Sequence, residues 1–203
     1  DEPPVEMKHN ETTYKSGLEQ FRKETVDDSA SRQRFMVSRE DGMEELKKDI
    51  LGCYKNPNVR LTAKPRVKFE GEEGLGSGPV REFLLCAIKI VEDGIEKYGK
   101  PLVFFEGEDN HKIPVHDHAL RCTGAFLAIG RIIGHSILHS GPFVYGVSQA
   151  ILQYWALTGE GEVDDISLDS LPLNLKDIPD IELRDHIMQV KCDYKMFIVI
   201  GTP

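Results

Sequence analysis

The stretch FEGEEGLGSGPVREFL, residues 69–84, determines how the core of this chain begins. A short run that ends in Val67 and Phe69 breaks into glycines interleaved with acids, and an apolar helix begins at Pro79. A dinucleotide-binding loop needs G-x-G-x-x-G and a P-loop needs G-x-x-x-x-G-K-[ST], but Gly74-x-Gly76-x-Gly78 has neither spacing. The neighbouring glutamates would also repel a phosphate. The glycines therefore predict a tight structural corner between a strand and a helix, and not a phosphate cradle.

Composition limits the classes of partner. The chain has 203 residues, of which 40% are apolar and 29% charged, as in an ordinary globular domain. A formal net charge of −9 argues against nucleic acid, whose phosphates need a basic surface. No apolar run is long enough to span a bilayer and no segment resembles a signal peptide, so no membrane partner is expected. The four cysteines lie far apart. Reduced thiols and an intracellular location, cytoplasmic or nuclear, are therefore expected.

The order of patterns predicts one helix-rich α+β domain with a few short strands over residues 34–203. Residues 1–33 are polar and acidic and predict a partly mobile leader, with a short helix through Leu18 and Phe21 as the alternative. Alternation at Phe35 and Val37 predicts a strand. The helix that follows is expected to begin with a capping box made by Asp41 and Glu44, and to carry Met43, Leu46, Ile50 and Tyr54 on one face.

The second half of the pattern is dominated by helices. An apolar stripe from Pro79 predicts a helix that ends near Gly99, and Pro65 before it suits an edge strand. Asp117 is expected to cap a long, buried helix in which Gly130 and Gly134 lie where another backbone comes close. Also expected are a strand over 102–105, helices over 148–159 and 177–190, and a strand-like tail over 194–201.

Several residues invite a catalytic or metal-binding interpretation. His135 and His139 stand four apart, as in H-E-x-x-H, but Ser136 occupies the place of the general-base glutamate. His116 and His118, with Cys122 one turn on, lack a second ligand pair for zinc. No G-x-S-x-G elbow is present. The sequence therefore predicts no metal, no cofactor and no catalytic residue, with Cys86 and Cys122 as buried hydrophobic thiols. A metal hydrolase is the remote alternative.

Charged residues on apolar helices predict an internal ion pair. Arg81 and Glu82 lie in the first turn after Pro79, and Arg131 interrupts an otherwise apolar helix. A buried charge is normally paired. We expect Arg131 to donate to a carboxylate or to carbonyls of the glycine corner and so to brace it. The candidate carboxylates are Glu72, Glu73 and Glu82.

Two motifs, in order and with the right separation, resemble the amino-terminal lobe of HECT-type ubiquitin ligases. That family carries a strand, an F-x-G-E-x-G-x-D-x-G-G turn and a helix that opens R-E-F-F, and later a helix with F-x-G-R-x-[IL]-G. VSRED, from Val37, resembles the family's opening V-x-R segment, and residues 171–187 resemble a helical stretch of divergent members. Pro79 replaces the second glycine of the family's pair. The matching residues are Phe69, Gly71, Glu72, Glu73, Gly74, Gly78, Arg81, Glu82 and Phe83, and then Ala125–Gly134 with Gly130 and Arg131.

The resemblance implies ubiquitin transfer through a cysteine thioester, with a ubiquitin-conjugating enzyme, ubiquitin and an unidentified protein substrate as partners. The family's active cysteine lies in a separate carboxy-terminal lobe in a Thr-Cys-Phe setting, which no cysteine here has. The chain is therefore expected to be the large subdomain of the amino-terminal lobe alone, and inactive by itself. The alternative is a non-catalytic protein-interaction module derived from such a lobe.

Overall fold

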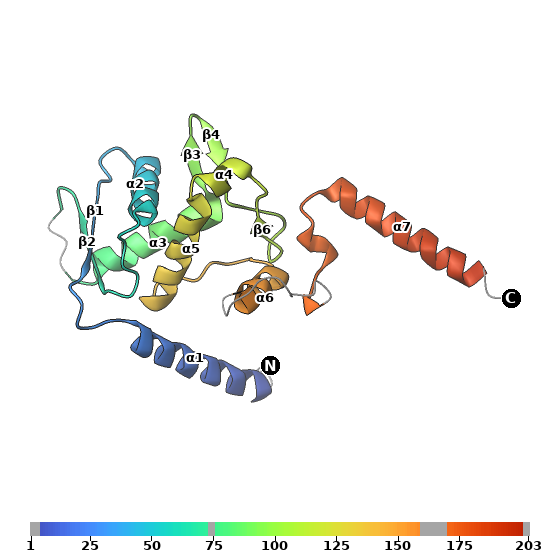
Figure 1. Ribbon diagram of the computed structural model, residues 1–203, viewed down its shortest axis with the longest axis horizontal. Coiled ribbons are helices and arrows are strands. Elements are labelled where there is room, and N and C mark those ends of the chain that lie inside the picture. Colours follow the sequence, from blue (N-terminus) through green and yellow to red (C-terminus); the bar gives the residue numbers. More distant parts are fainter. Residues whose placement is uncertain (1–4, 73–75, 159–169, 201–203) are drawn as a thin grey trace. The chain divides into compact units, whose positions relative to one another are not determined.

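A computed structural model describes residues 5–72, 76–158 and 170–200, and it has the predicted α+β class with many helices and short strands (Figure 1). The chain divides into two compact units. The first holds Asp1–Leu102 and Asp117–Phe143, and the second holds Val103–His116 and Val144–Pro203. The predicted domain boundary at residue 33 stays a prediction. None of the described helices is both long and apolar enough to cross a membrane.

The first unit is built on a strand–helix–strand segment. Strands β1 (Gln33–Val37) and β2 (Pro65–Phe69) run parallel, with helix α2 (Met43–Lys55) as the connection. Phe35 lies opposite Val67 in the register. Alternate side chains of both strands are buried, which confirms the predicted first strand. Pro65 is the first residue of its strand, a position at which the missing backbone N–H disturbs the hydrogen bonds of the sheet least.

Helix α2 begins differently from the prediction. Its N-cap is Gly42, without a side-chain cap, so the capping box of Asp41 and Glu44 is wrong. The Glu44 carboxylate instead accepts a hydrogen bond from the Glu96 backbone N–H at 2.8 Å and pairs with Lys47 at 2.9 Å. The predicted apolar face is confirmed at Leu46, Ile50 and Tyr54, which are buried, but Met43 at the start of the helix is exposed.

Helix α3 (Gly78–Asp93) starts at the predicted corner, with Pro79 in its first turn. The helix ends at Gly94, whose φ of 75° is a left-handed conformation. The predicted continuation to Gly99 is wrong, because β3 (Ile95–Lys97) and β4 (Lys100–Leu102) form an antiparallel hairpin there. The buried stripe of α3 consists of Phe83, Leu84, Cys86, Ala87, Ile88, Ile90 and Val91.

The long helix predicted after Asp117 is two helices. Asp117 does cap the first, α4 (His118–Cys122), by accepting from the Leu120 N–H at 2.9 Å. Gly124, with φ of 68°, then turns the chain into α5 (Ala125–Leu138). Helices α2, α3 and α5 pack on one another and enclose the core. The side chains that α5 buries are Ala125, Ala128, Ile129, Ile132, His135 and Ser136.

The close backbone approach expected at Gly130 and Gly134 is wrong. A Cβ atom built on either glycine meets no described atom within 4 Å. The crowded glycine is Gly141, where a Cβ would lie 2.4 Å from Ser136 Oγ and 3.0 Å from Leu84 Cδ1. Ser136 Oγ donates to the Pro142 carbonyl at 2.6 Å, so the turn after α5 has no room for a side chain.

The acidic leader contains one long helix, α1 (Val5–Thr25), in place of the short helix considered from the sequence. Its end is attached to the rest of the first unit. Arg22 Nε donates to the Ile137 carbonyl at 2.6 Å, and the Asp27 N–H donates to the Thr62 carbonyl at 2.9 Å.

The second unit has little sheet. Strand β5 (Phe105–Glu106) pairs with β6 (Ile113–Pro114), so the strand predicted over 102–105 is divided between two hairpins. Helix α6 (Gln149–Thr158) is confirmed. A 3₁₀ turn, η3 (Leu175–Asp177), precedes helix α7 (Ile181–Ile200).

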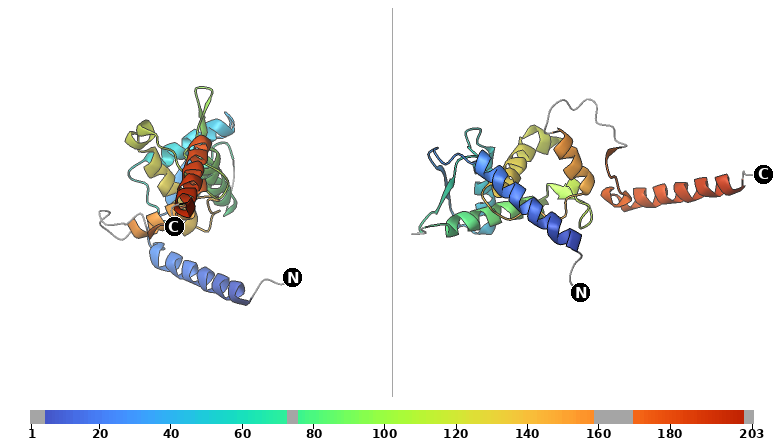
Figure 2. Two further views of the ribbon diagram at one scale, coloured as in Figure 1. Left: turned by 90° about the vertical axis from the view of Figure 1, so that its right-hand side faces the viewer. Right: turned by 90° about the horizontal axis from the view of Figure 1, so that it is seen from below.

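Helix α7 contains the tail that was predicted as a strand, so that prediction is wrong (Figure 2). The β-branched residues of the tail favour a strand locally. Asp180 caps the helix by accepting from the Leu183 N–H at 3.0 Å, and each further residue then adds a hydrogen bond to an existing helix.

Candidate functional site

The glycine corner is held by Arg39, which follows strand β1. Its guanidinium binds the Glu72 carboxylate through Nε and Nη2, and the Glu82 carboxylate through Nη1. Glu72 lies just after β2, and Glu82 lies in α3. One planar fork therefore connects the end of β1, the loop after β2 and the helix that the loop leads into. We call these three residues the Arg39 cluster.

The Arg39 cluster rests on the core at one side. The Cζ atom of Arg39 lies 4.2 Å from the centroid of the buried Phe69 ring, in cation–π geometry. The hydrogen bond from Arg39 is the main cause that lowers the pKa of the Glu72 carboxyl below its ordinary value. The side chains of Arg39, Glu72 and Glu82 are 35%, 42% and 45% exposed. Each pair therefore contributes modest stability, and the cluster mainly fixes geometry.

Two other charged residues, Glu73 and Arg81, were candidates for the corner. Glu73 lies outside the described residues. Arg81 is exposed, and its side chain makes no hydrogen bond or ion pair with the part of the chain that the structure describes. Of the acids proposed for the corner, Glu72 and Glu82 are the two whose partners are seen, and both bind Arg39.

Arg131 binds residues other than those expected from the sequence. Its Nη1 donates to the Tyr54 carbonyl at 2.8 Å and to the Asn56 carbonyl at 3.2 Å. These are carbonyls at the end of α2, where a helix leaves its last acceptors without partners and where a cation is favourable. No ion pair between Arg131 and a described carboxylate is formed. Arg131 therefore joins α5 to the end of α2 and does not brace the glycine corner.

Sequence reasoning did not single out Arg39. A signal was present: β1 and β2 are parallel, so their carboxyl ends meet at one edge of the sheet. Residues that follow both strands closely are therefore neighbours, and Arg39 and Glu72 are such a pair. The sequence does not show that β1 pairs with β2, and therefore it does not show that Arg39 and Glu72 are neighbours.

The two histidines of α5 have structural partners. The Tyr54 hydroxyl and His135 Nδ1 lie 2.6 Å apart, inside a cluster of rings that includes Phe35 and Phe83. Burial, with a smaller effect of the neighbouring His139, lowers the pKa of His135 to about 3, so this ring is neutral at pH 7. His139 Nε2 lies 2.7 Å from the Leu61 carbonyl and donates to it. Among the described residues, no group of histidine, cysteine and acidic side chains is placed to hold a metal ion.

Two of the described thiols, those of Cys53 and Cys86, are not activated as nucleophiles. Burial raises the pKa of Cys53 and Cys86, so neither thiol is activated as a thiolate. Cys122 was expected to be buried but is exposed. It is the last residue of α4, two residues before the chain turns at Gly124. Its Sγ lies 3.4 Å from His118 Nε2 on the same short helix. The side chain of Cys192 is outside the described residues.

Comparison with known proteins adds no identification. No protein-family model matches the chain. No curated protein matches it in sequence either. The resemblance to HECT-type ligases therefore rests on the quoted sequence motifs.

Proposed function

We propose that this chain is the large subdomain of the amino-terminal lobe of a HECT-type ubiquitin ligase. One observation carries the proposal. Arg39 of the V-x-R segment binds Glu72 of the F-x-G-E turn and Glu82 of the R-E-F helix opening. Arg39 thus pairs with one acidic residue from each of the two other segments that resemble the family. These three motif residues therefore share a structural role.

The later motif has a separate structural purpose. Arg131 of the G-R-x-[IL]-G segment satisfies carbonyls at the end of α2. Arg39 and Arg131 therefore each join elements that are distant in the sequence. Such residues are those that a scaffold needs, whereas a catalytic site would need an activated nucleophile.

In this proposal the chain supplies a scaffold, and the thioester cysteine belongs to another part of the ligase. Burial of Cys53 and Cys86 raises the pKa of both thiols and so favours an inactive role for this part. The partners would be a ubiquitin-conjugating enzyme, ubiquitin and a protein substrate, in the cytoplasm or the nucleus.

The test uses the chain together with its natural downstream coding sequence. Incubation with activating enzyme, ATP, ubiquitin and a panel of conjugating enzymes should give a ubiquitin adduct that a reducing agent releases. The 203-residue chain alone, as the matched control, should give none. An adduct on Cys53, Cys86 or Cys122 of the short chain would contradict the proposal, and so would the absence of an adduct with every conjugating enzyme on the longer one.

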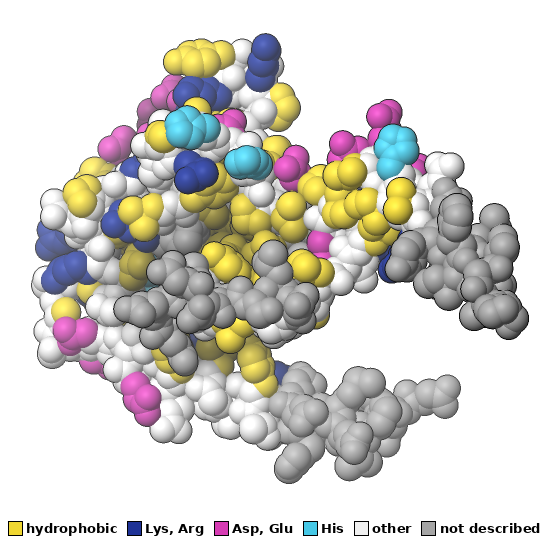
Figure 3. Space-filling view, turned by 45° about the vertical axis from the view of Figure 1, so that its right-hand side comes forward, with side chains coloured by type: hydrophobic (Ala, Val, Ile, Leu, Met, Phe, Trp, Pro, Cys, Tyr) yellow, Lys and Arg dark blue, Asp and Glu magenta, His cyan; other side chains and the backbone are white. Residues whose placement is uncertain are grey.

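A non-catalytic interaction module is the second candidate. It is favoured by exposed apolar side chains on α7, where Ile181, Met188 and Val190 are at least half exposed (Figure 3). Such residues are typical of a surface that another protein covers. A longer natural product without any reducible adduct would favour this second function.

A further inference from the structure

The two-stranded sheet of the first unit has a basic face. Its buried face carries Phe35, Val37, Val67 and Phe69. The alternate positions are exposed, and Arg34 stands opposite Arg66 in the register. Lys68 follows Arg66 on the same face, and Arg32 and Lys64 flank the strands. Neither strand has an acidic residue, although the whole chain has a net charge of −9.

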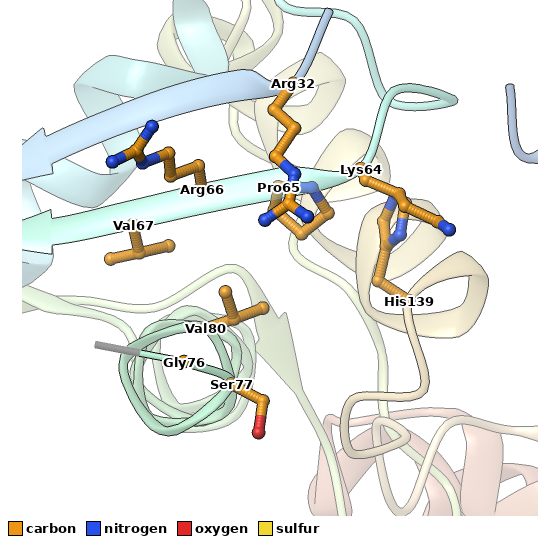
Figure 4. Close-up of a pocket in the computed structure, with 9 residues that line it drawn as sticks. All are labelled: Arg32, Lys64, Pro65, Arg66, Val67, Gly76, Ser77, Val80 and His139. Atoms are coloured by element: carbon orange, nitrogen blue, oxygen red, sulfur yellow. The ribbon is translucent and has the colours of Figure 1, made fainter. Parts of the chain in front are cut away.

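A cavity of about 550 Å³ lies beside this basic face. Figure 4 shows Val67 of β2 and Val80 of α3 directed toward each other, with Arg32 reaching across the start of β2. The volume is in the range of small-molecule sites and exceeds that needed by a single phosphate group. The cavity is lined by Arg32, Lys64, Pro65, Arg66, Val67, Gly76, Ser77, Val80 and His139.

The charges of the cavity are not balanced. Arg32 and Arg66 make no hydrogen bond or ion pair with the residues that the structure describes. Lys64 pairs with Asp28 at 2.8 Å, where both side chains are more than half exposed, so this pair is weak. None of the described residues that line the cavity is acidic. The side chains of Arg32 and Arg66 therefore border one open volume, and none of the described residues that line it supplies a counter-charge.

Glu72 and Glu82, two acids near the glycine corner, do not offset this charge, and Glu73 lies outside the described residues. Glu72 and Glu82 are bound by Arg39, and neither lines the cavity. The cavity also borders the start of α3, whose first turn carries no acidic residue. Gly76 and Gly78 have open space around them, with no described atom within 4 Å of a built Cβ. An anion can therefore approach the positive end of a 16-residue helix.

His139 forms a neutral wall of the cavity. Its Nε2 is occupied by the Leu61 carbonyl, and burial lowers the pKa of the ring. Among the described residues that line the cavity, the cationic side chains are those of Arg32, Arg66 and Lys64.

We propose that this cavity binds a phosphate monoester, with Arg32 and Arg66 as its ligands and with Pro65, Val67 and Val80 against the organic group that carries the phosphate. Planar guanidinium forks match phosphate oxygens and are the residues of choice for this contact. The phosphate comes from a phosphorylated protein side chain or from a small phosphate ester. The proposal does not rest on the ligase proposal, and either can fail without the other.

The test is calorimetric titration of the whole chain with inorganic phosphate, O-phosphoserine, a short phosphoserine peptide and the same peptide without phosphate. We expect the phosphorylated probes to bind and the unphosphorylated peptide not to bind. Tighter binding of the peptide than of O-phosphoserine indicates a protein source, and equal binding indicates a small ester. Either Arg32→Ala or Arg66→Ala should weaken binding about tenfold or more, because each removes charged hydrogen bonds.

Arg121→Ala is the matched control, since Arg121 is exposed on α4 and does not line the cavity. It should leave the affinity unchanged. Both cavity arginines are exposed, so circular dichroism should show that their variants keep the fold. The proposal is overturned if no phosphorylated probe binds at millimolar concentration, if the unphosphorylated peptide binds equally, or if Arg121→Ala weakens binding as much as Arg66→Ala.

Discussion

The two units of the molecule are stabilised by different interactions. Nearly all of the buried apolar side chains among the described residues belong to the first unit, where α2, α3 and α5 pack together. The second unit buries Phe104, Phe105 and Ala150 and leaves residues such as Leu152 and Val190 exposed. It is held by polar contacts instead, including His111 with Asp177 at 2.9 Å.

Backbone and ionic contacts complete the second unit. The Lys112 N–H donates to the Gly146 carbonyl at 2.8 Å, and the Ser148 N–H donates to the Lys112 carbonyl at 2.9 Å. Arg184 binds Glu108, whose side chain is 46% exposed. Exposed ion pairs contribute little, whereas buried apolar area contributes most of the free energy of folding. The difference teaches that the first unit holds most of the buried apolar core of the described chain, and therefore most of its folding stability.

The largest effect is expected in the core of the first unit. Phe83 is fully buried and its ring centroid lies 4.7 Å from that of Phe35. Phe83→Ala should lower the free energy of unfolding by about 3–5 kcal/mol. Trp155→Ala is the matched change in the second unit, where Trp155 is 37% exposed and touches Phe105 edge to face. Urea denaturation should show a much smaller loss for Trp155→Ala, and equal losses would remove the contrast between the units.

The crowding of Gly141 gives a second, smaller effect. Gly141→Ala forces a Cβ against Ser136 and Leu84 and should cost about 1–3 kcal/mol. Gly134→Ala is the control, because open space surrounds Gly134 within α5. Replacing this mid-helix glycine with alanine should raise the free energy of unfolding by about 0.5–1 kcal/mol. Thermal melts of the two variants should move in opposite directions, and a shared direction would contradict the packing described.

Acid should weaken the first unit through His135. Its pKa is about 3 in the folded chain and 6.5 ordinarily, so the unfolded chain binds a proton that the native chain does not. Stability is therefore fully present above pH 6.5 and declines as the pH falls from 6.5 toward 3, by up to about 1.4 kcal/mol per pH unit. His139 adds to this slope in the same direction, because its pKa is also lowered.

Denaturation at pH 7 and pH 5 measures the slope above the range in which carboxylates titrate. His135→Gln keeps an acceptor for Tyr54 and should make the slope shallower. An unchanged slope in this variant would mean that His135 is not the group responsible.

The smallest effect is expected at exposed ion pairs. Lys64→Ala should cost less than about 1 kcal/mol, because both side chains of its ion pair with Asp28 are more than half exposed. Arg39→Ala should also cost about 1 kcal/mol or less, because its partners Glu72 and Glu82 are partly exposed. Arg39→Lys should not restore the geometry, since a single ammonium cannot span both carboxylates. Double-mutant cycles of Arg39 with Glu82 measure the coupling, and zero coupling would contradict the cluster.

Local sequence signals predicted what local interactions decide. Alternation identified β1, the proline at position 79 identified the start of α3, and Asp117 identified a helix cap. Backbone conformation at single glycines was not visible: Gly94 and Gly124 adopt positive φ and divide elements that the apolar pattern makes continuous. The partners of Arg131 and Arg39 depend on which elements pack together, and a sequence pattern does not contain that information.

Native-state hydrogen exchange tests most directly the central claim that the first unit is the stable scaffold and that Arg39 fastens its corner. The slowest amides should lie in β2, α3 and α5, and those of α6 and the β5–β6 hairpin should exchange faster by local opening. In Arg39→Ala, added exchange should be confined to residues 70–72 and 76–82. Equal protection in both units, or added exchange throughout the first unit in Arg39→Ala, would contradict the account.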